Sequence, residues 1–81
     1  MAKEIKILGS GCDKCNQLYE RAVEAVQSTG TVAEVSKVSK VSEIIAFGVI
    51  TTPAMVIDGH VITTGRVPNL DEMKKLIADS T

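Results

Sequence analysis

Apolar and polar residues alternate in two separate segments of the chain. Over residues 4–8, Ile5 and Ile7 share one face while the charged residues take the other, a period of two that is typical of a β-strand. Residues 31–38 alternate in the same way and are rich in β-branched side chains, which favours a second strand. The pattern therefore predicts two strands in the first half of the chain.

Between these strands, apolar residues recur three and four positions apart, as they do on one face of a helix. We expect this helix to begin at Cys12, after the segment Gly9-Ser10-Gly11, and to end near Gly30, a residue suited to a helix C-cap. Its apolar face consists of Cys15, Leu18, Tyr19, Ala22, Val23 and Val26. A strand, a helix and a strand in this order form a βαβ unit with parallel strands and a right-handed crossover.

The next segments predict a short helix and a hairpin. Ser39 can cap a helix that runs through Phe47 and ends at a glycine. The apolar residues that we expect on the inner face of this helix are Val41, Ile44 and Ile45. The hairpin combines an apolar run over 54–57, which fits a buried strand, with the turn Asp58-Gly59 and an antiparallel strand over 61–63.

A last helix is predicted to follow Pro68. Asn69 can act as its N-cap, and Glu72 three residues later completes a pattern similar to a capping box. Its buried stripe consists of Leu70, Met73, Leu76 and Ile77. The element order is β-α-β-α-β-β-α, which predicts an α/β fold, with a four-stranded mixed sheet and helices on both faces, in a single domain over residues 1–81.

Charge and hydropathy narrow the classes of function. Nine Lys and Arg residues are scattered among ten Asp and Glu residues, so no basic stripe is available to follow a nucleic acid. The most apolar run, 44–50, is far shorter than the roughly 18 residues that a membrane-spanning helix requires. No apolar stretch of signal-peptide length follows the N-terminal residues. We therefore expect a cytoplasmic monomer with no membrane and no nucleic-acid partner.

Cys12 and Cys15 are the only cysteines, and they form a C-x-x-C motif where the first strand meets the first helix. Residues three apart share a helix face at a spacing that suits a disulfide. Because structural disulfides are rare in the cytosol and this one would close a very small loop, a redox-active pair or a metal site is favoured. We expect Cys12, at the positive helix end, to attack and the deeper Cys15 to resolve the mixed disulfide. Between them, Lys14 favours the thiolate and Asp13 opposes it.

Two other functions for the same residues stay open. Paired thiolates suit Cu(I) or Zn(II), so the chain could be a metal-binding or metal-handling module. One C-x-x-C supplies only two of the four ligands of a closed zinc site, and His60 is predicted in a hairpin turn. The element order also differs from the β-α-β-β-α-β of metallochaperones. The third possibility is an adaptor that binds a partner without catalysis. We expect no metal and no bound cofactor other than the Cys12-Cys15 disulfide.

The element order, the C-x-x-C motif and Thr52-Pro53 before the third strand resemble the thioredoxin and glutaredoxin superfamily. The segments 9–15 and 65–67 are most similar to the small redox-active disulfide proteins of archaea and bacteria. This resemblance covers nearly the whole chain. It implies a thioredoxin-like fold and the reduction of protein disulfides by dithiol exchange, with a thioredoxin reductase or glutathione as the electron donor.

The resemblance also implies roles for residues outside the motif. Pro53 would be cis, would face the cysteines and would keep metal out, and the backbone of Thr52 would pair with an extended substrate. Gly65 would let backbone approach the substrate, although from the sequence alone it could equally be a turn glycine. Arg66 could bind a substrate carboxylate, but a solvated charge at the start of the last helix is favoured.

Three departures from this superfamily affect the expected chemistry. Thioredoxin carries a buried acid six positions before its first cysteine, and here that position holds Lys6, which we expect to pair with Glu34 on the neighbouring strand. Gly11 replaces the tryptophan that precedes the first cysteine of thioredoxin. The C-P-Y-C motif and glycine pair of glutaredoxins are absent. The electron donor therefore stays open.

Overall fold

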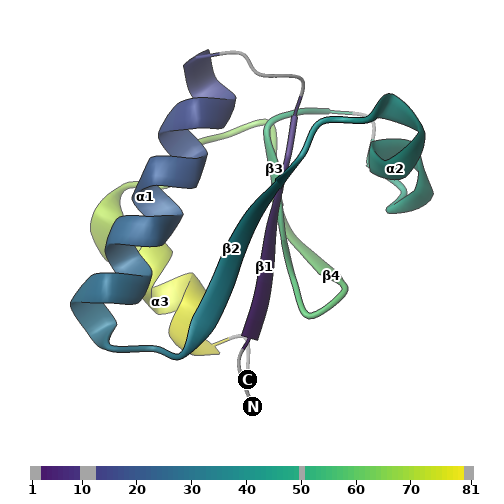
Figure 1. Ribbon diagram of the computed structural model, residues 1–81. Helices are drawn as coiled ribbons and strands as arrows, with labels where there is room; N and C mark the ends of the chain where they lie inside the picture. Colours follow the sequence, from purple (N-terminus) through teal and green to yellow (C-terminus); the bar gives the residue numbers. More distant parts are fainter. Residues whose placement is uncertain (1–2, 10–12, 50, 80–81) are drawn as a thin grey trace.

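The computed structural model describes residues 3–9, 13–49 and 51–79. Along the chain, the elements are β1 (Lys3–Leu8), α1 (Asp13–Thr29), β2 (Ala33–Val38), α2 (Val41–Ala46), β3 (Ala54–Ile57), β4 (His60–Thr64) and α3 (Leu70–Asp79) (Figure 1). This order is the one that the hydrophobic pattern predicts. None of the helices in the described ranges has both the length and the apolar character needed to cross a bilayer.

One mixed sheet joins the strands in the order β2-β1-β3-β4. β1 is parallel to β2, as the βαβ unit requires, and antiparallel to β3, which in turn is antiparallel to β4. The turn between β3 and β4 is formed by Asp58 and Gly59, and Asp58 takes a φ of 50°, the left-handed conformation that a tight hairpin turn requires. The predicted hairpin is therefore confirmed.

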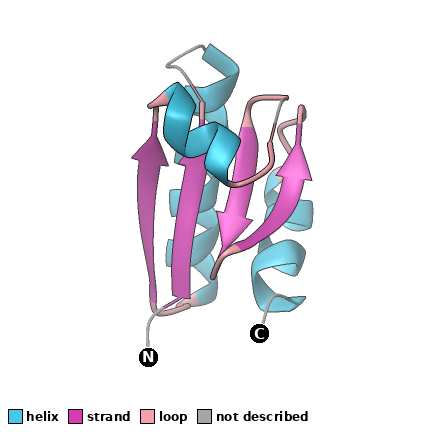
Figure 2. Cartoon of the chain, turned by 90° about the vertical axis from the view of Figure 1, so that its right-hand side faces the viewer, coloured by secondary structure: helices cyan, strands magenta, loops and turns pink. Residues whose placement is uncertain are grey.

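Helices cover both faces of the sheet. α1 and α3 lie side by side on one face, and α2 lies alone on the other (Figures 1 and 2). Alternate residues of β1 and β3 therefore enter different cores, because side chains in a strand point to opposite faces. The core under α1 and α3 includes Ile5, Ile7, Leu18, Ala22, Ala25, Met55, Ile57, Met73 and Ile77. The smaller core under α2 includes Leu8, Ile44, Val49, Ala54 and Val56.

The N-cap of α3 agrees with the prediction. The backbone N–H of Glu72 donates a hydrogen bond of 2.8 Å to Oδ1 of Asn69, the residue before the helix. This bond satisfies one of the backbone donors that the first turn of a helix leaves unpaired.

Helix α2 differs from the prediction. Its N-cap is Lys40 and not Ser39, no side chain caps it, and it ends at Ala46. Of the three apolar residues expected on its inner face, Ile44 is buried, whereas Val41 and Ile45 are 63% and 62% exposed. The reason is the length of α2, because six residues make less than two turns and only one position reaches the small core below.

Candidate functional site

The site is built at the end of the sheet where β1 and β2 finish and α1 begins. β1 and β2 are parallel and end together at Leu8 and Val38. The backbone N–H of Gly9, the first residue after β1, donates to the carbonyl of Val38 at 2.9 Å. Ligands of open α/β sheets bind at the carboxyl ends of such strands.

Cys15 lies in the first turn of α1 and is 5% exposed, with the preceding residues Asp13 and Lys14 exposed to solvent. Its side chain packs on the backbone of Gly9, where a Cβ atom would stand 2.1 Å from Cys15 Sγ. The prediction that Cys15 is shielded on the apolar face is therefore confirmed. Cys12 lies outside the described residues.

Thr52 and Pro53 lie beside this end of the sheet. Their peptide bond is cis, and Pro53 is buried while Thr52 is exposed. The antiparallel register pairs Leu8 of β1 with Ala54 of β3. Gly9 follows Leu8 and Pro53 precedes Ala54, so Gly9 and Pro53 lie at the same level of the sheet. The chain thus brings Pro53 to the edge at which Gly9 covers Cys15.

Gly65 completes this edge after β4. Its backbone N–H donates to the carbonyl of Pro53 at 2.7 Å. It has a φ of 70°, and a Cβ there would lie 2.8 Å from Cγ2 of Thr51. Both the backbone conformation and the close contact favour glycine at this position.

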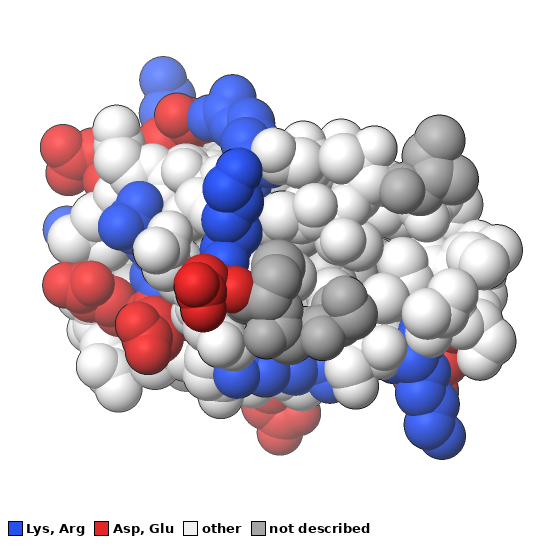
Figure 3. Space-filling model, turned by 90° about the horizontal axis from the view of Figure 1, so that it is seen from above, with Lys and Arg blue, Asp and Glu red and all other residues white. Residues whose placement is uncertain are grey.

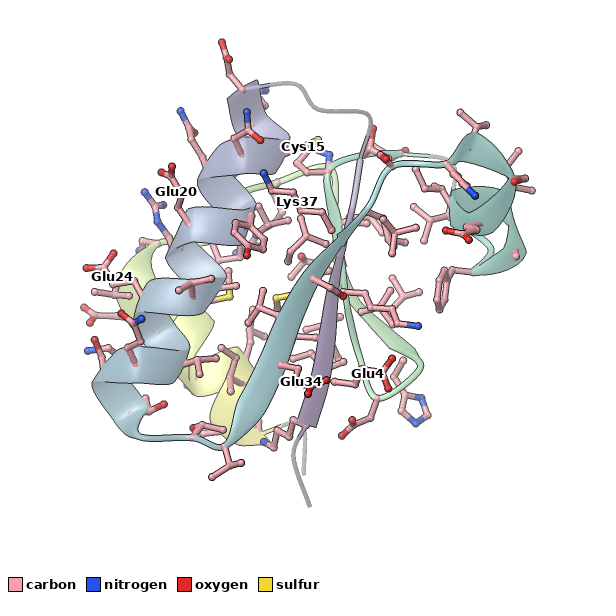
Figure 4. The ribbon with its side chains drawn as sticks, viewed as in Figure 1. Glu4, Cys15, Glu20, Glu24, Glu34 and Lys37 are labelled. Atoms are coloured by element: carbon pink, nitrogen blue, oxygen red, sulfur yellow. The ribbon has the colours of Figure 1, made fainter. Side chains whose placement is uncertain are left out.

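A hollow of about 110 Å³ borders Cys15 on the side of β2. Among the described residues, its lining includes Ile7, Gly9, Cys15, Asn16, Lys37 and Ser39. Lys37 reaches from β2 toward α1, where Nζ donates to Asn16 Oδ1 at 3.1 Å and lies 4.6 Å from the centre of the Tyr19 ring (Figure 4). Neither the contact of Gly9 with Cys15 nor the position of Lys37 was predicted from the sequence. The parallel register of the βαβ unit is the signal that could have found Lys37, because it brings the end of β2 to the start of α1.

Seen from above, this end of the molecule has two parts (Figure 3). Lys, Arg, Asp and Glu side chains gather over the side of α1, and the surface toward α2 is largely uncharged. A partner that covers both parts would meet charge on one side and neutral surface on the other.

The basic residues Lys6 and Arg66 each have an acidic partner. Lys6 forms an ion pair of 3.1 Å with Glu4 and lies 5.4 Å from the centre of the Phe47 ring, so the expected pair with Glu34 is wrong. The register explains this result, because Glu34 lies opposite Glu4 and Lys6 shares its strand face with Glu4. Arg66 forms an ion pair with Glu72 in the first turn of α3.

Across residues 3–9, 13–49 and 51–79, no three His, Cys, Asp or Glu side chains come together as a metal site would require. His60 is exposed and pairs with Ile57 at the turn between β3 and β4, whereas Cys15 lies near the other end of β3. His60 is therefore placed away from Cys15.

Comparison with known proteins agrees with this architecture. The chain is 41% identical over 71 residues to a thioredoxin of Methanocaldococcus jannaschii, a match that covers 88% of this chain and 81% of that protein. It is 35% identical over 75 residues to a thioredoxin of Methanothermobacter thermautotrophicus, covering 93% of this chain and 97% of that protein. A family model described as a thioredoxin domain matches residues 3–78, and the chain therefore belongs to the thioredoxin domain family.

Proposed function

We propose that this protein is a thiol-disulfide oxidoreductase that reduces protein disulfides through Cys12 and Cys15. Membership of the thioredoxin family supports a redox role. The observation that carries the proposal is the placement of Cys15, which is buried in the first turn of α1 against Gly9 and follows Cys12 by three residues. A thiol in this position is shielded from external disulfides yet is spaced to react with a neighbour one turn away.

The proposed reaction transfers two electrons to the substrate. The thiolate of Cys12 attacks one sulfur of the substrate disulfide, which forms a mixed disulfide and releases the first substrate thiolate. The thiolate of Cys15 then attacks Cys12 Sγ, so that the mixed disulfide breaks and the Cys12-Cys15 disulfide forms. The second substrate thiolate leaves and takes a proton from water.

The cycle needs an external two-electron donor to restore both thiols. We assign this role to a thioredoxin reductase or to glutathione, either of which requires a reducing compartment. On the substrate side, Thr52 is exposed beside Pro53, which accepts a hydrogen bond from Gly65, and an extended segment would pair with the backbone of Thr52. The uncharged surface toward α2 favours substrates that are neutral around the disulfide.

Ellman's reagent, a small disulfide that releases coloured thionitrobenzoate, tests this proposal. Reduced wild-type protein should release two thionitrobenzoates per chain and keep none, because Cys15 displaces the second one. The Cys15→Ser variant should release one and retain the other on Cys12, as intact-protein mass would show. Equal trapping by the matched Cys12→Ser variant would contradict the assigned roles.

A second measurement separates this function from the two alternatives. The reduced wild-type protein, mixed with Cu(I) or Zn(II) and passed through a desalting column, should not retain stoichiometric metal. It should instead catalyse the reduction of insulin by dithiothreitol, and the double Cys→Ser variant should not. Retained metal without reductase activity would favour a metal-binding module.

A further inference from the structure

The two edges of the sheet differ in how well they are protected. β2 and β4 are the outer strands, so one side of each has backbone groups that no other strand of the described chain binds. Proteins protect such edges with bulges, prolines or projecting lysines. β4 has a register irregularity at Met55 and Val56, which disrupts the regular spacing of its outer groups. β2 contains no proline and pairs with β1 without a break, so β2 is the edge that is open to another strand.

The bonds from β2 to β1 determine which groups point outward. The carbonyls of Val32 and Val38 accept hydrogen bonds of 3.0 and 2.9 Å from the first residue of β1 and from the residue that follows β1. Successive residues of a strand direct their backbone groups to opposite sides. Even-numbered residues of β2 therefore face β1, and Ala33, Val35 and Lys37 direct their N–H and C=O groups away from the sheet.

The lysine of β2 does not shield this edge. Lys37 Nζ donates to Asn16 Oδ1 at 3.1 Å and lies 4.6 Å from the centre of the Tyr19 ring. The side chain is thus held against α1 and does not project from the sheet. In Figure 2, β2 is the strand at the far left, and no helix of the described chain lies beyond its outer edge. A second strand therefore has free access to β2.

Apolar side chains stay partly uncovered along this edge. Val32, directly before β2, is 72% exposed, more than any other large apolar residue in the described ranges. Ala33 and Val35 of β2 and Tyr19 of α1 are only partly buried where they pack on the core. A partner at this edge would remove apolar surface from water, which the hydrophobic effect favours.

We propose that β2 pairs with β2 of a second copy of this chain, antiparallel and about a two-fold axis at Val35. Val35 is the middle one of the three residues whose backbone groups point outward. The axis places it opposite its own copy and places Ala33 opposite Lys37, so these outward groups bind one another. From the sequence we expect a monomer, and the open edge of β2, which the strand order reveals, changes that expectation. The inference does not depend on the proposed function.

The side chains across this axis are complementary. Val32 lies opposite the half-buried Val38 of the second copy. Glu34 lies opposite Ser36, whose hydroxyl group can donate to the carboxylate. No like charges stand directly opposite each other, although the two Glu34 side chains lie on the diagonal and keep the dimer weak.

Neighbouring registers are less favourable. An axis at Glu34 would place two carboxylates opposite each other, which destabilises an antiparallel pair. An axis at Ser36 would leave Val32 beyond the end of the other β2. The axis at Val35 is therefore the register that covers Val32 without opposing two like charges.

This pairing leaves both redox sites open. The two β2 strands run antiparallel, so the sheet ends near which each Cys15 lies point in opposite directions. Thr52 and Pro53 lie next to β3, which β1 separates from the interface. Two four-stranded sheets thus join into one, with a substrate-binding edge at each end.

Sedimentation velocity over a wide range of protein concentration tests this dimer, with reductant present so that no disulfide between chains contributes. We expect a monomer in dilute solution and a dimer toward millimolar concentration. Ser36 is exposed and provides two variants of opposite charge. Ser36→Lys places an ammonium group opposite each Glu34 and should strengthen the dimer by about tenfold. Ser36→Glu places a carboxylate there and should weaken the dimer by about tenfold.

Two controls separate this effect from changes in folding. Within one chain, Ser36 lies beside Lys6, so Ser36→Glu should if anything stabilise the monomer while it weakens the dimer. Thr64 is an exposed hydroxyl residue of the other edge strand. Thr64→Lys and Thr64→Glu should leave the dimer affinity at the wild-type value.

Amide hydrogen exchange locates the interface. The N–H groups of Ala33, Val35 and Lys37 should exchange more slowly as the protein concentration rises, whereas those of Glu34 and Ser36, which face β1, should not change. A chain that stays monomeric up to millimolar concentration would overturn the inference. So would a dimer of equal affinity in both Ser36 variants, or protection that rises at α2 or β4 instead of β2.

Discussion

Gly9 and Cys15 are packed backbone against side chain, so closely that a Cβ at position 9 would stand 2.1 Å from Cys15 Sγ and 3.0 Å from Cys15 Cβ. The thiol is held between the end of β1 and the first turn of α1. Gly9 is fixed in turn by its hydrogen bond to Val38. Neither partner can move without disturbing a strand end.

Replacing Gly9 with alanine should therefore force Cys15 out of position. We expect the free energy of unfolding to fall by about 1–3 kcal/mol, as for other overpacked interiors, and the second thionitrobenzoate to be released more slowly. Chemical denaturation and stopped flow measure the two effects. Wild-type stability and wild-type kinetics in Gly9→Ala would show that the contact is not tight.

Gly30→Ala is the matched control for this substitution. Gly30 has a φ of 68° but no neighbour within 4 Å of a Cβ. The change should cost about 1 kcal/mol through backbone strain alone and leave the release of both thionitrobenzoates at the wild-type rate. The pair of variants thus separates a loss of stability from a displacement of Cys15.

A second close contact, between Gly65 and Thr51, can be tested by a double-mutant cycle. Gly65→Ala should destabilise the protein by about 1–3 kcal/mol, because it adds a Cβ 2.8 Å from Thr51 Cγ2 to a residue with positive φ. Thr51→Ala removes that methyl group, so the double variant should recover part of the loss. Strictly additive effects in denaturant unfolding would mean that only the backbone conformation disfavours alanine.

Helix α2 offers a pair of adjacent isoleucines in opposite environments. Ile44 is 6% exposed in the small core and Ile45 is 62% exposed. Ile44→Ala should lower the free energy of unfolding by about 2–3 kcal/mol, and Ile45→Ala should change it by less than about 0.5 kcal/mol. If the two variants lost the same free energy of unfolding in thermal or chemical denaturation, Ile45 would have to be covered by another molecule in solution.

The same helix shows how far the sequence could predict this structure. Long periodic segments such as α1 and α3 were found because each repeats its apolar position over several turns. In α2, Val41 and Ile45 are apolar without being buried, and six residues contain too few repeats to show which face is inside. Periodicity alone could not decide this case.

The site, too, could be predicted only in part. Spacing along the chain is enough to place Cys15 on the inner face of a helix. The contact with Gly9 and the hollow shared with Lys37 depend on how closely α1 packs on the strand ends and on which direction a long side chain takes. No local pattern in the sequence encodes either distance.

Lys6 is the last residue to test, because it occupies the position of the superfamily's buried acid but lies away from Cys15. Its side chain is one third exposed, pairs with Glu4 and lies on the sheet face that α2 covers. Cys15 belongs to α1, the helix that covers the other face. Lys6→Gln should therefore leave unchanged the rates at which the first and the second thionitrobenzoate are released, and the pH dependence of both rates. The change in stability should be below about 0.5 kcal/mol. A displaced pH dependence of the second release would instead place Lys6 in the electrostatic environment of Cys15, and the separation of the two faces would not hold for this reaction.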